Sequence, residues 1–374
     1  MAVLPKEKGC DVEGLILGRY RRIEEYTPVV PLEVLAERAG ITVDQVIKLD
    51  GNENPYGCSP RVQQALAAFQ HYHIYPDPEH RDVRPLLAEY VGVGQEHILA
   101  SSGSDELIDL VVRLFIEPGD QVINCVPTFG MYEFVAQIFG GEVVALPRRD
   151  DFGVDVEAVL RAIGRRTKLI FVASPNNPTG NLTPVEDILA LLETGKVVVV
   201  DEAYAEFSGR SVASLVPDHD NLVVLRTFSK WAGLAGLRAG YGIFPLPIIK
   251  HLWKIKQPYN VNVAALIAIR ESFADIEYLR ATNEAMVKER ERLIAMLAET
   301  GIVDPWPSAA NFVYCPVLRG DARWITEELA RRGIFIRYFD KPLLKNSIRV
   351  SVGRPEQTDR LIAALREIGE QLGE

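Results

Sequence analysis

The continuous apolar character of two short segments constrains the fold of this chain more than any other feature. The segments are Lys196–Asp201 (KVVVVD) and Lys168–Ala173 (KLIFVA). A β-strand that shows one face to water alternates apolar and polar residues, whereas a strand buried on both faces is apolar throughout. Strands of the second kind occur in mostly parallel sheets that helices cover on both sides. The two segments therefore indicate an α/β fold.

Short β-rich runs alternate with amphipathic helical patterns from about residue 60 to residue 262. This alternation predicts a large domain with a seven-stranded, mostly parallel sheet sandwiched between helices. The seven predicted strands are His97–Ser101, Gln121–Cys125, Glu142–Leu146, Lys168–Ala173, Lys196–Asp201, Asn221–Thr227 and Ala239–Phe244.

The pattern changes after these strands. A long helical stretch, roughly Val263–Thr300, precedes three β-like runs and two helices, which predicts a smaller α+β domain. We expect residues 1–31 to form an N-terminal arm, residues 60–262 the large domain, and residues 32–59 with 263–374 the small domain. The β-like runs of the small domain are Ala310–Cys315, Ile334–Tyr338 and Ser347–Val352, and its two later helices are predicted over 322–332 and 356–371.

Composition and charge exclude several classes of protein. The 374 residues include 41 Lys and Arg against 51 Asp and Glu, a formal net charge of −10, whereas nucleic-acid-binding proteins normally carry a basic surplus. Apolar stretches such as Ile243–Ile249 fall far short of the roughly 20 residues that span a membrane. The four cysteines lie apart without a C-x-x-C pair, which fits a reducing cytoplasm. We therefore expect a cytoplasmic protein without nucleic-acid or membrane partners. Because His71, His73 and His80 lack further ligands nearby, we expect no metal.

Ligands of open α/β sheets collect where parallel strands end, so the residues that follow each predicted strand are candidates for a site. The segment Gly103-Ser104-Asp105-Glu106 opens a helical pattern, and it could cradle a phosphate with free N–H groups or simply cap that helix. Phe129 could stack on a planar ligand or cover the core. Asn177 lies in a Pro- and Gly-rich turn, which would hold its amide in one orientation or only connect two elements.

Two further strand ends carry charged groups. Asp201 ends the run of four valines, where a buried carboxylate needs a cation such as a protonated ring nitrogen; a helix cap or a metal ligand is the alternative. Lys230 can form a Schiff base once its pKa is lowered, and Ser229 and Arg238 beside it can hold a phosphate. Together with Tyr204, these groups are the ones that pyridoxal 5′-phosphate requires.

A series of motifs extends this pattern along the chain: NENPYG at 52–57, YPD at 75–77, GSDE at 103–106, PTFGMY at 127–132, PNNPTG at 175–180, DEAYAEF at 201–207, RTFSK at 226–230, GLAGLRAGY at 233–241, YNVN at 259–262, ANFV at 310–313 and IRVSVG at 348–353. In these motifs the chain resembles the fold-type I pyridoxal-phosphate-dependent aminotransferases of class I and II, most closely the histidinol-phosphate aminotransferases. The resemblance runs from Tyr26 to Val352.

The resemblance implies a role for each residue around the cofactor ring. Lys230 would carry the cofactor as a Schiff base and then move the proton between the substrate Cα and the cofactor C4′. Asp201 would pair with the ring nitrogen, while Asn177 and Tyr204 would bond the ring 3′-oxygen. Phe129 would stack on the ring, at a position where many relatives have tyrosine.

The resemblance also implies a phosphate site. Ser104 and Asp105 would offer backbone N–H groups to the cofactor phosphate, which Ser229 and Arg238 would also hold. Tyr56 would reach the phosphate of the cofactor in a neighbouring subunit, which implies a homodimer with shared active sites.

The implied reaction is transamination of L-histidinol phosphate with 2-oxoglutarate, which gives imidazole-acetol phosphate and L-glutamate in histidine biosynthesis. Arg337 and Arg349 match the arginines that receive the anionic group of the substrate, and Tyr26 and Asn177 match further substrate contacts. An aromatic amino-acid aminotransferase is an open alternative, and a lyase similar to threonine-phosphate decarboxylase is a more distant one. Trp231 is bulkier than the residue expected after the lysine, and no role for it follows from the sequence.

Overall fold

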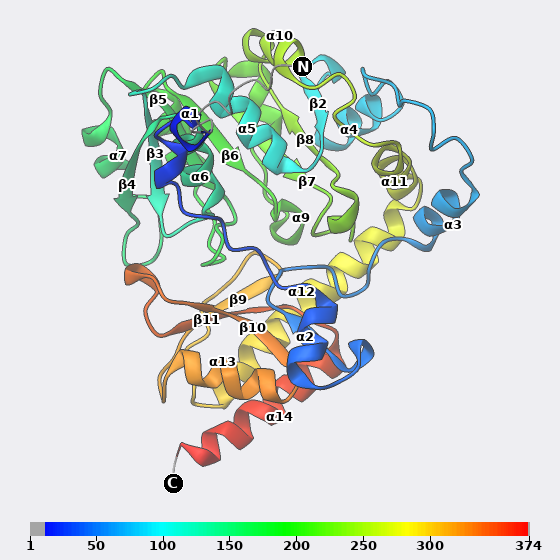
Figure 1. Cartoon of the computed structure of the whole chain (residues 1–374), viewed down its shortest axis with the longest axis vertical. Helices are drawn as coiled ribbons and strands as arrows, with labels where there is room; N and C mark the ends of the chain where they lie inside the picture. The colour runs from blue at the N-terminus through cyan, green and yellow to red at the C-terminus, as the bar shows by residue number, and fades with distance from the viewer. Residues whose placement is uncertain (1–11, 373–374) are drawn as a thin grey trace, which may run out of the picture.

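The computed structural model describes residues 12–372, and these residues form two β-sheets, each covered by helices (Figure 1). The larger sheet has the strand order β2-β8-β7-β6-β5-β3-β4. In this sheet β8 runs antiparallel to β2 and β7, and the other neighbouring pairs are parallel. The expected seven-stranded, mostly parallel α/β sheet is confirmed. Its strands are β2 (Ile98–Ser101), β3 (Gln121–Val126), β4 (Glu142–Pro147), β5 (Thr167–Ala173), β6 (Val197–Asp201), β7 (Leu222–Thr227) and β8 (Gly240–Ile243).

Burial on both faces of the sheet explains the continuous apolar runs. In β6, Val198 and Val200 belong to one hydrophobic cluster and Val199 to another on the opposite face. Helices cover both clusters, so these strands have no wet face and the apolar–polar alternation disappears. One face carries α5 (Ser104–Phe115), α6 (Met131–Ile138) and α10 (Leu246–Ile255); the other carries α4 (Arg84–Val91), α7 (Val156–Ala162), α8 (Val185–Leu192) and α11 (Val263–Ala274).

The smaller sheet joins an early strand to three late ones. Its order is β1-β10-β11-β9, in which β1 runs parallel to β10 and the other pairs are antiparallel. Helices from both ends of the chain pack around it (Figure 1). Its strands are β1 (Ile47–Leu49), β9 (Phe312–Pro316), β10 (Ile334–Phe339) and β11 (Ser347–Ser351), and its helices are α2 (Leu32–Ala39), α12 (Ile276–Glu299), α13 (Ala322–Arg331) and α14 (Pro355–Gln371).

The long helical stretch expected over roughly Val263–Thr300 consists of two helices, α11 and α12, which Asp275 separates. Its backbone leaves the helical region, with φ −126° and ψ 39°, and its carboxylate accepts a hydrogen bond from the Ser59 hydroxyl. Neither glycine nor proline marks this break; the signal at this point is Asp275, a residue type common at helix N-caps, which precedes α12. The remaining α-helices are α1 (Val12–Leu15), α3 (Pro60–Ala68) and α9 (Ala205–Ser208).

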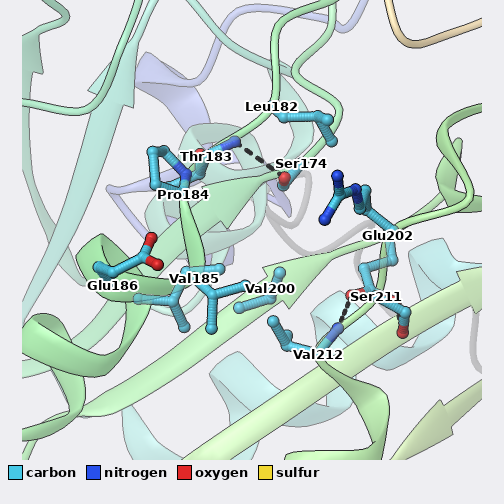
Figure 2. A pocket seen from close by; sticks show the side chains of 12 residues that line it. Ser174, Leu182, Thr183, Pro184, Val185, Glu186, Val200, Glu202, Ser211 and Val212 are labelled. Carbon is cyan, nitrogen blue, oxygen red and sulfur yellow. Dashed lines mark hydrogen bonds between the residues drawn. The ribbon is translucent and has the colours of Figure 1, made fainter.

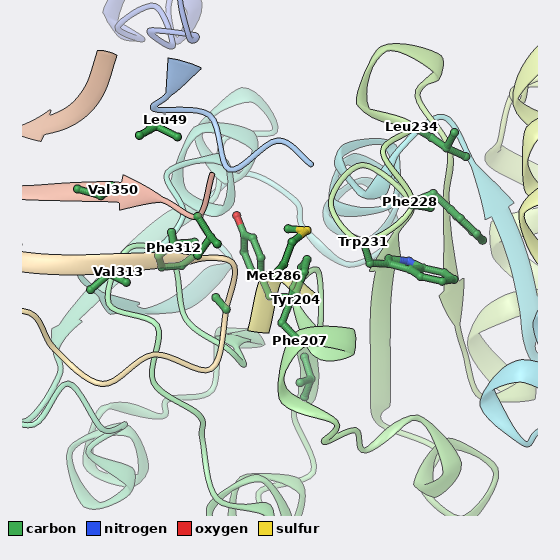
Figure 3. Packing of buried hydrophobic residues seen from close by; sticks show 14 of the residues in the cluster. Leu49, Tyr204, Phe207, Phe228, Trp231, Leu234, Met286, Phe312, Val313 and Val350 are labelled. Carbon is green, nitrogen blue, oxygen red and sulfur yellow. The ribbon is translucent and has the colours of Figure 1, made fainter. Parts of the chain in front are cut away.

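One hydrophobic cluster continues from the larger sheet into the smaller one (Figure 3). The Tyr204 ring, just after β6, packs edge-on against Phe312 of β9 with ring centroids 5.1 Å apart. Met286 of α12 belongs to the same cluster. This shared core holds the smaller sheet against the loop that follows β6. None of the helices between residues 12 and 372 combines the length and the apolar character needed to cross a membrane.

Candidate active site

Asp201 is a buried carboxylate at the end of β6, at the edge of the sheet where the parallel strands finish. It is 5% exposed. The Tyr132 hydroxyl donates to its Oδ2 at 2.7 Å, and the Ala203 N–H donates to its Oδ1 at 3.0 Å. Burial raises the pKa of Asp201 to about 6, although these two hydrogen bonds oppose the rise. A carboxylate in this position is stabilised by a cation placed beside it.

Lys230 follows β7 and lies at the same edge. Its Nζ donates to the Gly51 carbonyl at 3.1 Å and lies 6.0 Å from the centroid of the Tyr204 ring. Burial, followed by the positive charge of Arg349, lowers the pKa of Lys230 to about 8. Near neutral pH an appreciable fraction of this amine is uncharged, which is the form that attacks a carbonyl.

A cradle for an anion lies at the N-terminus of α5. The Arg238 guanidinium crosses this terminus and pairs with Asp105 at 2.9 Å. A Cβ at Gly103 would lie only 2.4 Å from Arg238 Nη2, and a Cβ at Gly240 would lie 2.6 Å from the Gly103 carbonyl carbon. Glycine at both positions therefore lets the guanidinium and the free N–H groups of the helix converge, and such convergence suits a phosphate.

Ser229 and the two ring-oxygen candidates are also fixed by hydrogen bonds. The Thr227 hydroxyl donates to the Ser229 hydroxyl at 2.9 Å. Asn52 Nδ2 donates to the Tyr204 hydroxyl at 3.0 Å, and burial raises the pKa of Tyr204 to about 12. Asn177 Oδ1 accepts a hydrogen bond from the Arg349 guanidinium. Tyr204 is therefore a neutral phenol near neutral pH, able to donate its proton to a ligand oxygen.

Two arginines approach the site from the smaller sheet. Arg337 of β10 and Arg349 of β11 are directly opposed in the antiparallel register, so their side chains leave the same face of the sheet. Arg349 is 7% exposed and donates to the Asp50 carbonyl at 2.6 Å, while its Nε has no partner. Burial lowers the pKa of Arg349 to about 10, and the neighbouring charge of Arg337 acts in the same direction.

The N-terminal segment contributes Tyr26 to this group. The chain between α1 and α2 passes from the larger sheet to the smaller one (Figure 1). Burial raises the pKa of the Tyr26 phenol, and the charges that act on it belong to Arg337, Asp105 and Arg349. Tyr26 therefore lies among the arginines and the anion cradle. Its ring also contacts Phe134 of α6, with centroids 6.2 Å apart.

Comparison with known proteins identifies the family. Residues 44–365 match the family model for aminotransferase class I and II. The histidinol-phosphate aminotransferase of Roseiflexus castenholzii is 51% identical over 96% of this chain and 99% of its own length. The chloroplastic histidinol-phosphate aminotransferase of Nicotiana tabacum is 48% identical over 95% of this chain and 86% of its own. The chain belongs to the class I and II aminotransferases.

A solved structure agrees with this assignment. The histidinol-phosphate aminotransferase of Sinorhizobium meliloti, crystallised in complex with pyridoxal-5′-phosphate, has a TM-score of 0.87 and 30% identity, and the match covers 96% of this chain and 98% of that one. The L-threonine-O-3-phosphate decarboxylase of Porphyromonas gingivalis, at 22% identity and a TM-score of 0.77, shares the fold.

The sequence candidate Tyr56, and Trp231, to which the sequence assigned no role, each pack against aromatic or guanidinium neighbours. The Tyr56 ring in this aminotransferase packs under the Arg354 guanidinium, 5.3 Å from its centroid, and its carbonyl accepts a hydrogen bond from Tyr278. Trp231 is a core residue: its ring stacks on Tyr90 at 5.4 Å with an interplanar angle of 2°, and Phe228 lies beside it (Figure 3). Packing therefore explains the bulk of Trp231. Phe129 packs edge-on against Tyr132, with centroids 5.7 Å apart.

Sequence reasoning missed two supporting residues of this aminotransferase site. Tyr132 bonds Asp201, and Asn52 bonds both Tyr204 and, through its Oδ1, the Ser351 hydroxyl. Tyr132 lies in the motif PTFGMY and Asn52 in the motif NENPYG, so membership of a motif was the sequence signal that could have found them. Their partners depend on the order of strands in the sheets, which those motifs do not contain.

Proposed function

We propose that this chain catalyses pyridoxal-phosphate-dependent transamination between L-histidinol phosphate and 2-oxoglutarate, giving imidazole-acetol phosphate and L-glutamate. The observation that carries the proposal is the opposed pair Arg337 and Arg349 beside Lys230. Like charges directly opposite across two strands destabilise a sheet. Within residues 12–372 neither guanidinium forms an ion pair with a carboxylate, so a dianionic phosphate on the substrate would relieve the repulsion.

The residues present fit pyridoxal phosphate. When bound, this cofactor supplies an electron sink for the bonds at the substrate Cα. The cradle of Gly103, Ser104, Asp105 and Arg238 suits its phosphate, and Asp201 suits its protonated ring nitrogen. Ser229 supplies a further hydroxyl to the phosphate.

We assign the proton transfer to Lys230. Its Nζ would hold the cofactor as a Schiff base, and its amine, once free, would accept the substrate Cα proton and return a proton to the cofactor C4′, across the nitrogen that joins the two carbons. A pKa of about 8 suits both the acceptance and the release of a proton near neutral pH. Asp201 would keep the proton on the ring nitrogen, Asn177 and Tyr204 would bond the ring oxygen, and Phe129 would stack on the ring.

We assign substrate selection to the smaller sheet and the arm. Arg337 and Arg349 offer two guanidinium forks, which bind a phosphate or a carboxylate through paired N–H groups. Tyr26, held among these charges, donates its hydroxyl to the same anion, and Asn177 orients the substrate beside Arg349. After the phosphate-bearing product has left, the carboxylates of the second substrate, 2-oxoglutarate, bind the same two guanidiniums.

We further propose a cytoplasmic homodimer in which Tyr56 reaches the cofactor phosphate of the partner. The proposed units are an arm at 1–31, a large domain at 60–262 and a small domain at 32–59 with 263–374; residues 1–11 of the arm and 373–374 of the small domain lie outside the described residues. An exposed aromatic pair supports an association surface: Tyr75 and Tyr259 stack with centroids 4.4 Å apart while 77% and 47% exposed. The free thiols of Cys58, Cys125 and Cys315 fit a reducing compartment.

The test is a panel of half-reactions. The protein loaded with pyridoxal phosphate is mixed separately with histidinol phosphate, phenylalanine, tyrosine, aspartate and threonine phosphate, and the loss of visible cofactor absorbance is followed. We expect histidinol phosphate to react fastest and 2-oxoglutarate to restore the absorbance. Fast conversion by phenylalanine with none by histidinol phosphate would establish the aromatic alternative. Release of carbon dioxide from threonine phosphate would establish the lyase.

A further inference from the structure

A buried ion cluster lies behind the sheet edge that carries the active site. Arg226 of β7 is 6% exposed, and its Nε donates to Glu202 at 2.8 Å while its Nη1 donates to Glu206 at 2.7 Å. Its Nη2 donates to the Ser211 hydroxyl at 2.8 Å, and that hydroxyl donates to Glu202 at 2.8 Å. We call these four residues the Arg226 cluster. Every nitrogen of the guanidinium is used.

The Arg226 cluster is tied to three site residues through the chain itself. Glu202 directly follows Asp201, and Glu206 comes two residues after Tyr204. Arg226 lies four residues before Lys230. One guanidinium thus clamps both ends of the segment 202–206, from the strand that leads to the lysine. The other Glu202 oxygen accepts the Val212 N–H at 2.6 Å, which closes the loop behind the segment.

Two cavities border the Arg226 cluster, so the side chains around it are not packed on every side. A cavity of about 370 Å³ is lined by Glu202 and Ser211, which lie with Val212 on one wall of it (Figure 2). A second cavity of about 320 Å³ is lined by Glu206 and Arg226. Packing is therefore incomplete on these sides of the segment, although Tyr204 and Phe207 are buried in the shared core, and the hydrogen bonds of the guanidinium add a directional restraint there.

Stability is also a poor explanation for three buried charges. Ion pairs of this kind give up the hydration of each charge, and apolar side chains of equal volume often stabilise a fold as well or better. What an arginine fork provides is a fixed geometry between its partners. Glu202 is one residue from Asp201 and Glu206 is two residues from Tyr204, so a fixed geometry in the Arg226 cluster also fixes the positions of these two site residues.

We propose that Arg226 is a positioning residue, which holds the segment 201–206 so that the Asp201 carboxylate and the Tyr204 hydroxyl stay aligned with Lys230. Arg226 touches no reacting atom and acts through Glu202 and Glu206. The inference deepens the proposed function and rests on it for the identity of the aligned ligand, but the alignment itself is a property of the cofactor-free protein.

The experiment compares Arg226→Lys, which keeps the charge and loses the fork, with Ser211→Ala, which removes one bond from the Arg226 cluster. In cofactor-free protein, we expect Arg226→Lys to speed hydrogen exchange at the amides of Ala205 and Phe207, which bond Glu202 and Tyr204 carbonyls. In loaded protein, we expect pyridoxal phosphate to bind about tenfold more weakly and kcat to fall roughly 10- to 100-fold. The pH midpoint of the bound cofactor's absorbance should also shift. Ser211→Ala should change the exchange rates, the cofactor affinity, kcat and the pH midpoint in the same directions, but by less.

The control is Leu365→Ala in α14, a fully buried side chain of the smaller sheet's core. It should lower Tm and leave the exchange rates of those amides, the cofactor affinity and the pH midpoint unchanged. Arg226→Lys behaving like this control would overturn the proposal. Should Arg226→Lys not fold, unchanged values in both Ser211→Ala and Glu206→Gln would overturn it equally. Failure of the unaltered protein to bind pyridoxal phosphate at Lys230 would contradict the proposed function, and the exchange rates would still decide the role of Arg226.

Discussion

The two halves of the site differ in how their polar atoms are satisfied. On the larger sheet, Asp201 has a hydrogen-bond donor at each oxygen, Lys230 donates to a carbonyl, and Arg238 is paired with Asp105. On the smaller sheet, Arg349 faces Arg337 with no carboxylate of residues 12–372 in an ion pair with either. The polar groups of the first half are joined by hydrogen bonds within the protein, whereas the two arginines of the second have no carboxylate in an ion pair within residues 12–372, which leaves them open to an anionic ligand.

This difference teaches how one site can keep a cofactor and exchange substrates. A group that stays bound is best held by donors and acceptors already in place, because no reorganisation is then needed at each turnover. A substrate has to enter and leave, so the charge that receives it must be free between turnovers. Arg349 stands between the two halves, since it donates to Asn177 and also lowers the pKa of Lys230.

We call the part of the site on the larger sheet, with Asp201, Lys230 and Arg238, the fixed half, and the part on the smaller sheet, with Arg337 and Arg349, the open half. The largest effect should come from Lys230→Ala, which removes the amine of the fixed half. We expect the half-reaction with histidinol phosphate to slow by at least about 10⁴-fold, because the covalent link and the proton carrier are lost together. The measurement is single-turnover absorbance, with mass spectrometry of peptides after borohydride reduction. Lys256→Ala is the matched control, since Lys256 is also buried but donates to its own loop. A cofactor adduct that persists in Lys230→Ala and disappears in Lys256→Ala would reverse the assignment.

Arg337→Ala tests the open half. Loss of charged hydrogen bonds to the substrate phosphate should raise KM for histidinol phosphate roughly 10- to 100-fold, about 1.5–3 kcal/mol, with little change for phenylalanine. Arg337→Lys should recover part of the loss, because it restores the charge without the fork. Steady-state kinetics with both donors gives the comparison. If KM rises equally for histidinol phosphate and for phenylalanine, Arg337 does not bind the substrate phosphate and has a structural role instead.

The pH dependence of cofactor uptake tests whether Arg349, in the open half, affects Lys230, in the fixed half. Because the neutral amine of Lys230 attacks the cofactor aldehyde, uptake by cofactor-free protein should rise with pH and reach half its maximum near pH 8. Removing the positive charge in Arg349→Met should raise the pKa of Lys230 and move the midpoint to higher pH, still below 10.5 because burial remains. Arg337→Met should move it less. If the midpoint stays the same or falls in Arg349→Met, the charge of Arg349 does not lower the pKa of Lys230, and the proposed link between the two halves is wrong.

The sequence predicted the main residues of the fixed half, but it did not predict the residues that hydrogen-bond to them. β5 and β6 were predictable because burial on both faces leaves a continuous apolar run, and Asp201 follows directly from where such a run ends. The bond from Tyr132 to Asp201 was not predictable, because it depends on β5 lying between β3 and β6. The Asn52–Tyr204 bond depends likewise on β1 joining a sheet whose other strands come near the C-terminus.

Trp231 separates residues that belong to the site from residues that merely adjoin it. It follows Lys230 directly, yet its ring lies in an aromatic cluster with Tyr90, Phe228 and Phe273, away from the polar groups of either half. Trp231→Phe should therefore lower the free energy of unfolding by about 1–2 kcal/mol through lost stacking and volume, while kcat stays within about twofold. Denaturant unfolding and single-turnover rates measure the two effects on one sample. A large fall in kcat with unchanged stability would place Trp231 in the fixed half, and the boundary of that half would then have to include the residue after the lysine.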